Sequence, residues 1–80
     1  MHEAKLCLQL LALAETHRGR AGAERILALR LQVGALSGVS PDALALAFPI
    51  CAAGTAADGA ALRIEMAPGR DLRLADMEVL

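Results

Sequence analysis

Apolar residues near the start of the chain recur with the spacing of an amphipathic helix. From Glu3 to about His17 they return every three or four positions, and mostly polar or small residues fall between them. The apolar positions are Leu6, Cys7, Leu10, Leu11, Leu13 and Ala14. The segment RGRAG that follows has arginines and glycines, which are typical of a helix C-terminus. We therefore expect a helix that ends by about residue 20.

The next segment alternates between apolar residues and others, which is the period of a strand with one buried face. We expect this strand from about Glu24 to Val33, with an apolar set at Leu27, Leu29, Leu31 and Val33. The GALSG that follows lacks the spacing of a phosphate-binding loop. Gly34 and Gly38 suit a positive φ or a close backbone approach, so we interpret the segment as a structural turn.

A second, alanine-rich helix is expected after this turn. Ser40 can cap it, Pro41 suits its first position, and Asp42 lies at the positive end of the helix dipole. Pro49 lacks an amide hydrogen, and a proline costs about 3 kcal/mol inside a helix. We therefore expect a kink or the helix end near Phe48.

Two more alternating segments complete the chain, and PGRD joins them. Their period predicts two strands that pair as a hairpin. The apolar positions change phase in the second strand, so we expect a β-bulge near Ala75 or Asp76 that returns the later residues to the inner face. The apolar sets are Leu62, Ile64 and Met66, then Leu72, Leu74, Met77 and Val79.

The order helix, strand, helix, strand, strand predicts an α+β fold. We expect a two-layer domain in which two helices pack on one face of a three-stranded β-sheet. Eighty residues suit a single domain with one core, so residues 1–80 are expected to form one unit. The apolar content is 56% and Phe48 is the lone aromatic residue, so this core is aliphatic.

Composition and charge exclude several kinds of partner. The formal net charge is −1, no basic stripe is present and Tyr and Trp are absent, so nucleic acid is not expected. No apolar run reaches the roughly 18 residues of a membrane span and no secretory signal is present, so we expect no membrane contact and a cytoplasmic protein. Cys7 and Cys51 stand outside any CxxC pattern, and we interpret them as two buried thiols.

The first three residues, MHE, carry the strongest candidate chemistry. The Met1 amine, the His2 amide and imidazole nitrogens and the Glu3 amide nitrogen can all reach one ion. Deprotonated amides favour square-planar coordination, which is diagnostic of Ni(II) or Cu(II). Such a site requires a free amine and weakens with acidity, because every ligand must lose its proton. A lone histidine near an N-terminus is more often solvated, so these residues by themselves leave both interpretations open.

Longer stretches of the chain resemble a known family. MHE before a leucine-rich helix, ERILALRLQVG, GALSGVSPDAL, the AF of Ala47 and Phe48, and the GT..DGA.L.IE that leads to PGR are similar to the HypA/HybF family of nickel metallochaperones for hydrogenase maturation. The similarity covers almost the whole chain, and MHE and GALSGV are its most specific parts.

The resemblance implies a nickel-binding metallochaperone involved in NiFe hydrogenase maturation. Its partners would be a maturation GTPase and the hydrogenase large subunit, into which nickel is inserted. Carried over by position, His2 is the principal nickel ligand, while Met1 and Glu3 contribute main-chain nitrogen. The Glu3 carboxylate would hold the site by a hydrogen bond or serve the handover. The chain shows no recognisable nucleophile arrangement, so it is not expected to be an enzyme.

The chain departs from the family pattern at one place. In the family, PGR is followed by a zinc domain with two CxxC pairs before the last strand. Here Arg70 is joined directly to Asp71, so the zinc domain is expected to be absent and nickel to be the only metal.

One alternative to the nickel interpretation remains at this point. The chain could be a non-metal interaction or assembly module of the maturation machinery, pairing as a homodimer through an exposed or exchanged last strand.

His17 is interpreted as a helix-end residue rather than a second ligand. Cys7, Cys51, Met66 and Met77 are interpreted as core residues rather than ligands.

Overall fold

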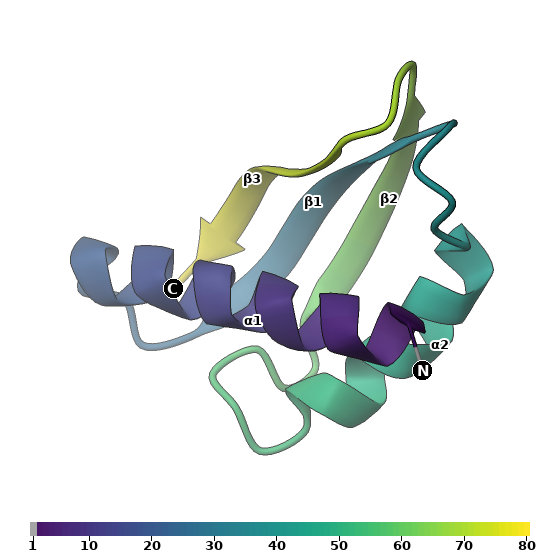
Figure 1. Cartoon of the computed structure of the whole chain (residues 1–80). Coiled ribbons are helices and arrows are strands. Elements are labelled where there is room, and N and C mark those ends of the chain that lie inside the picture. The colour runs from purple at the N-terminus through teal and green to yellow at the C-terminus, as the bar shows by residue number, and fades with distance from the viewer. Residues whose placement is uncertain (1) are drawn as a thin grey trace.

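The computed structural model describes residues 2–80, with side chains from Glu3 onward. Its elements are α1 (His2–Ala21), β1 (Ile26–Gly34), α2 (Pro41–Ala52), β2 (Ala61–Ala67) and β3 (Leu72–Val79). Both helices cover one face of a three-stranded sheet (Figure 1). The predicted two-layer α+β architecture and the order of its elements are therefore confirmed.

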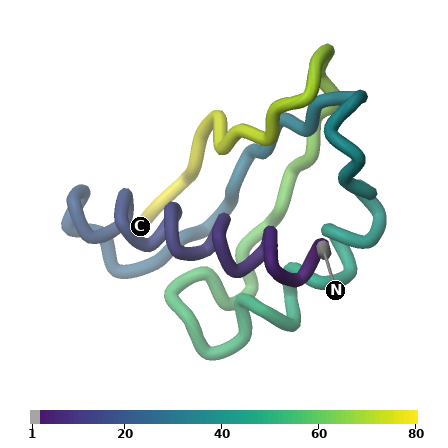
Figure 2. Tube along the Cα trace, viewed as in Figure 1, coloured from purple at the N-terminus to yellow at the C-terminus, as the bar shows by residue number. Residues whose placement is uncertain are grey.

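The strands lie in the order β2-β1-β3, so the predicted hairpin of the last two strands is wrong. β1 pairs in parallel with β2 and antiparallel with β3. The reason is that α2 returns the chain to the end of the sheet where β1 began, and a strand that follows such a crossover runs parallel to the first. β3 then adds to the other edge of β1, and Figure 2 shows the chain passing from β2 over the end of β1 to reach it.

This passage is held by backbone hydrogen bonds to the end of β1. Gly34 N donates to Asp71 O and Leu36 N donates to Gly69 O, each at 2.8 Å. A Cβ atom on Gly34 would lie 2.5 Å from Gly69 O, so only glycine fits beneath the link. Gly38 has a φ of +79°. The prediction that GALSG is a structural turn with a close approach and a positive φ is confirmed.

The predicted bulge in the last strand is present. Arg30 is opposite Asp76 and Leu31 is opposite Leu74, which leaves Ala75 as the extra residue on β3. The extra residue restores the inner face beyond it. As a result, three apolar side chains of β3 pack against the core: Leu72, Leu74 and Met77.

A second irregularity lies at the start of β1. Ile26 and Ala28 are opposite the consecutive residues Val79 and Glu78, so Leu27 is unmatched. Ile26 and Ala28 are buried, whereas Leu27 is exposed. The predicted inward position of Leu27 is therefore wrong, because strict alternation does not pass through this irregularity.

Three further residues predicted on inner faces are exposed: Leu13, Met66 and Val79. Leu13 lies on the flank of the apolar stripe of α1, whose buried centre contains Leu10 and Ala14. Met66 lies near the end of the edge strand β2, and Val79 ends the edge strand β3. Interpretation of Met66 as a core residue is thus wrong.

The core lies between the helices and the sheet. It is aliphatic apart from Phe48, as predicted, and its central side chains come from both helices and from β1: Cys7, Leu10, Ala14, Leu29, Leu31, Val33, Leu44, Ala47, Phe48 and Ala52. A kink or a helix end was predicted near Phe48; helix α2 continues through Pro49 to Ala52, so the end is wrong, while the kink stays a prediction. Pro49 cannot donate a hydrogen bond to the carbonyl of Ala45, but both residues are exposed, so water can bind this carbonyl. Burial of Phe48 and Ala52 in the core stabilises the last turn of the helix.

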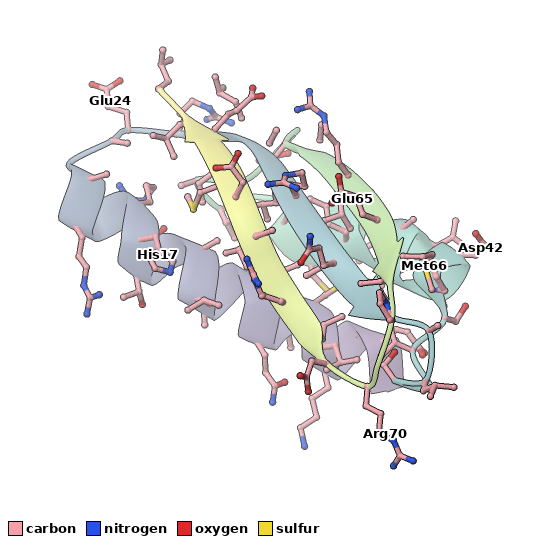
Figure 3. All side chains as sticks on the ribbon, turned by 90° about the horizontal axis from the view of Figure 1, so that it is seen from above. His17, Glu24, Asp42, Glu65, Met66 and Arg70 are labelled. Carbon is pink, nitrogen blue, oxygen red and sulfur yellow. The ribbon has the colours of Figure 1, made fainter. Side chains whose placement is uncertain are left out.

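The open face of the sheet is charged. Arg30 of β1 forms an ion pair with Glu65 of the neighbouring strand β2, with 3.0 Å between nitrogen and oxygen. Arg63 of β2 forms a second ion pair, also at 3.0 Å, with Glu78 of β3 on the other side of β1. Figure 3 looks onto this face, with Glu65 in front and the helices behind. Among residues 2–80, neither helix has the length and apolar character needed to cross a membrane.

Candidate metal centre

The predicted ligands lie at the start of α1. The helix begins at His2, and Glu3 lies in its first turn. Met1 and the His2 side chain lie outside the described residues, so their ligand roles remain a prediction. Of the predicted set, the structure describes the half-buried Glu3 side chain and the backbone of the first turn.

The Glu3 carboxylate contacts the start of the second helix. Ser40 N donates to Glu3 Oε2 at 3.5 Å, a long hydrogen bond. Ser40 is itself the N-cap of α2, because its Oγ accepts a hydrogen bond from Ala43 N at 3.2 Å. The carboxylate thus lies near the positive ends of both helices, where a negative charge is stabilising. This contact ties the first turn of α1 to α2.

The backbone nitrogens of the first turn are available for coordination. The first four amides of an α-helix have no acceptor within the helix, and those of His2 and Glu3 are among them. A metal ion bound there would break no hydrogen bond of the helix. The positive end of the dipole opposes a cation by about 0.3–1 kcal/mol. The negative charges of the deprotonated amides and of the Glu3 carboxylate attract the cation and offset this unfavourable interaction with the dipole.

The remaining candidate ligands do not assemble a second site. In the described part of the chain, no three side chains of His, Cys, Asp or Glu come together as a metal ion would need. His17 is exposed near the other end of α1, as Figure 3 shows. It lines a shallow opening with Asp76 and Met77 of β3. About 15 residues of helix, or roughly 22 Å, separate His17 from His2, so both cannot bind one ion.

The two cysteines are free thiols with different environments. Cys7 is fully buried, as predicted, and its Sγ donates to Leu44 O at 3.7 Å. Burial, with the neighbouring Cys51 thiol as a smaller cause, raises the pKa of Cys7 to about 11. A metal ligand must be a thiolate, so Cys7 is poorly suited to this role. Cys51 is only half-buried, which corrects the prediction that both thiols are buried.

The sequence contained no sign of the contact between Glu3 and Ser40. The two residues are 37 positions apart, and each has a sufficient local explanation as part of a helix start. Only the packing of α1 beside α2 brings them together.

The fold defines a class: a small two-layer α+β domain in which the first turn of α1 lies against the start of α2. Residues 1–75 match the family described as "Hydrogenase/urease nickel incorporation, metallochaperone, hypA". The chain therefore belongs to the HypA family. Members of this family are metallochaperones rather than enzymes, which agrees with the prediction from the sequence.

Individual relatives support the assignment. The chain is 49% identical over 69 residues to "Hydrogenase maturation factor HypA" of Deinococcus radiodurans, a match covering 86% of this chain and 58% of the relative. It is 43% identical over 70 residues to the protein of the same name from Geobacter sulfurreducens, covering 88% of this chain and 61% of the relative. The matched part thus spans about 60% of the length of these relatives.

A solved structure has the same fold. The solution structure of the Ni metallochaperone HypA from Helicobacter pylori superposes with a TM-score of 0.73, covering 98% of this chain and 92% of that one. The sequence identity is 16%, so this likeness concerns the fold alone.

Proposed function

We propose that the chain is a nickel-binding metallochaperone that acts in NiFe hydrogenase maturation, in the step that inserts nickel into the large subunit. The observation that carries this proposal is the family match over residues 1–75, whose description names nickel incorporation. Relatives named as hydrogenase maturation factors support the choice of client. A maturation GTPase and the hydrogenase large subunit are the partners of this proposal, and the cytoplasm, where free thiols such as Cys7 and Cys51 persist, is its location.

The proposed nickel site is the N-terminus itself. His2 is the principal ligand, through its imidazole and its amide nitrogen, and the Met1 amine and the Glu3 amide complete a square-planar set. Two observations support this set: the amides of the first helical turn have no acceptor within α1, and the Glu3 carboxylate is directed to Ser40 N. In this arrangement Glu3 positions the first turn through Ser40 while its backbone nitrogen binds the metal.

We also propose that this domain works without a zinc module, so that nickel is its only metal. The support is local: β2 and β3 are joined by the short link after Ala67, and the backbone of that link is hydrogen-bonded to Gly34 and Leu36. The junction between Arg70 and Asp71 is continuous, and the strands on both sides pair with β1. A zinc module is therefore not needed to hold the sheet together.

Replacement of the gene in its own organism tests the function. Cells would carry the parent chain, His2→Ala or His17→Ala, and hydrogenase activity would be measured under limiting nickel. The parent and His17→Ala are expected to support activity, because His17 lies at the far end of α1. His2→Ala is expected to abolish it. Full activity with His2→Ala, together with loss on deletion of the gene, would contradict nickel carriage and favour the interaction module.

A further inference from the structure

Two free thiols lie where α1 packs against α2. Cys7 comes from α1, and its Sγ donates to Leu44 O of α2 at 3.7 Å. Cys51 lies two helical turns after Leu44 on the same side of α2, and a helical side chain leans back over the turn that precedes it. The Cys51 thiol is therefore directed toward the place where Cys7 contacts α2.

Further contacts place the two thiols next to each other. Cys51 packs against the same core cluster that contains Cys7. The residues one turn before the two cysteines, Ala4 and Ala47, line one groove, and their small side chains let the helices approach closely. Burial is the main cause that raises the pKa of Cys7, and the neighbouring Cys51 thiol raises it further, which agrees with this placement.

The two thiols differ in their access to solvent. Cys7 has no exposed surface, whereas Cys51 is half-buried and lines the groove on the outer side of α2, beside the exposed Leu46 and Ile50. None of the residues that line this groove is charged. A small neutral oxidant such as hydrogen peroxide can therefore reach Cys51 but not Cys7. An accessible thiol beside a second cysteine is the arrangement of redox-sensing cysteine pairs.

We propose that Cys51 and Cys7 form a reversible disulfide when the chain reacts with a peroxide. In the first step the Cys51 sulfur bonds to one peroxide oxygen, the O–O bond breaks, and the other oxygen leaves as water with the thiol proton. The Cys7 sulfur then bonds to the Cys51 sulfur, the S–O bond of the sulfenic acid breaks, and a second water leaves with the Cys7 proton. Two thiols are thus oxidised to a disulfide, and one peroxide is reduced to two waters.

The disulfide joins α1 to α2 by a covalent bond. Cys7 lies one turn after Glu3, so the cross-link holds the start of α1 beside Ser40 while the thiols are oxidised. It also closes the loop of residues 7–51, which restricts the unfolded chain and stabilises the folded one. In a reducing compartment such disulfides are transient and return to thiols. The proposal does not rest on nickel binding.

Exposure of the metal-free chain to hydrogen peroxide tests the proposal. The parent, Cys7→Ala and Cys51→Ala are treated for equal times, free thiols are blocked with iodoacetamide in urea, and each chain is digested with trypsin. In the parent, mass spectrometry should find residues 6–18 linked to residues 31–63, the peptides that contain Cys7 and Cys51, while the undigested chain keeps the mass of a monomer. Dithiothreitol should separate the two peptides. Circular dichroism confirms that each variant is folded.

The single variants report the order of the two steps. In Cys7→Ala, oxidation of Cys51 should stop at the sulfenic acid, which a cyclic diketone traps. In Cys51→Ala, loss of the Cys7 thiol should slow at least about tenfold relative to the parent, because peroxide does not reach the buried sulfur. The oxidised parent should unfold at a Tm at least about 8 °C above that of the same sample after reduction with dithiothreitol.

Three results would overturn the proposal. The first is a parent in which Cys7 keeps its free thiol, whether or not Cys51 is oxidised. The second is a disulfide found only between separate chains, and the third is an oxidised parent with a Tm below that of the reduced sample. Because no metal is present, each of these results leaves the nickel proposal unaffected.

Discussion

Gly34 is the residue on which the passage of the chain from β2 to β3 most directly depends. A Cβ atom at this position would meet three backbone atoms of the link: Gly69 O at 2.5 Å, Gly69 C at 2.8 Å and Asp71 N at 2.9 Å. Backbone atoms cannot rotate away as a side chain can. In Gly34→Ala the link must therefore move off the end of β1.

The cost follows from the contacts that this movement disturbs. Overpacking in a close contact costs about 1–3 kcal/mol. The displaced link also stretches the hydrogen bonds from Gly34 N to Asp71 O and from Leu36 N to Gly69 O, each contributing about 0.5–1.5 kcal/mol. We expect Gly34→Ala to lower the free energy of unfolding by roughly 2–6 kcal/mol, a large part of the roughly 4–12 kcal/mol expected for a domain of this size.

Thermal unfolding followed by circular dichroism measures this loss. For a domain of this size, about 1 kcal/mol corresponds to a change in Tm of about 4–8 °C, so Tm should fall by at least about 8 °C. Gly19→Ala is the control, because a Cβ atom there would meet nothing within 4 Å beyond its chain neighbours and the backbone of its own helix, α1. It should leave Tm unchanged or raise it slightly. A Gly34→Ala variant with the Tm of the parent would refute the tight crossing of the link over β1.

Three further predictions concern the cap of α2 and the buried thiol. Ser40→Ala removes the acceptor for Ala43 N and should lower the free energy of unfolding in urea by about 1 kcal/mol, whereas Ser40→Thr should lose less; equal stability of all three chains would contradict the cap. In the folded chain, iodoacetamide should label Cys51 well before Cys7 by mass spectrometry, because Cys7 is buried and its pKa is raised to about 11; equal labelling rates would refute this. Because the native state holds the Cys7 proton more tightly than the unfolded state, stability should fall as pH rises from about 9 toward 11, and Cys7→Ala should lack this part of the fall.

Local features of the sequence were enough to predict the start of α2 and the bulge in β3. The start of α2 could be predicted because Ser40, Pro41 and Asp42 each have a local role there. The bulge at Ala75 could be predicted because the apolar residues change phase around it. Both features depend on residues close to one another in the chain.

Pairing between strands could not be predicted in the same way. Alternation shows that a strand has an inner face, but it does not show which strand lies beside it. The parallel position of β2 depends on the path of α2. The position of β3 depends on the link between β2 and β3, which can pass close to the backbone of Gly34 because this residue has no side chain. The glycine was recognised as a site of close approach, yet the segment that approaches it is 35 residues away.

The candidate site was predictable only in part. MHE and the family resemblance predict a set of consecutive ligands, Met1, His2 and Glu3, and this set stays a prediction. The contact of Glu3 with Ser40 could not be predicted, since it arises from the packing of two helices. The apolar outer side of α2 was likewise hidden, because periodicity alone did not separate Leu46 and Ile50 from the inner residues.

A nickel titration of the untagged chain tests the central claim most directly. Calorimetry would count the bound ions, and visible absorption would report square-planar Ni(II), for the parent, His2→Ala, His17→Ala and a chain acetylated at its N-terminus. We predict one nickel per chain for the parent and for His17→Ala, and none at the square-planar site for His2→Ala or the acetylated chain. No binding by the parent with a free amine, or equal binding by His2→Ala, would contradict a nickel site built from Met1, His2 and Glu3.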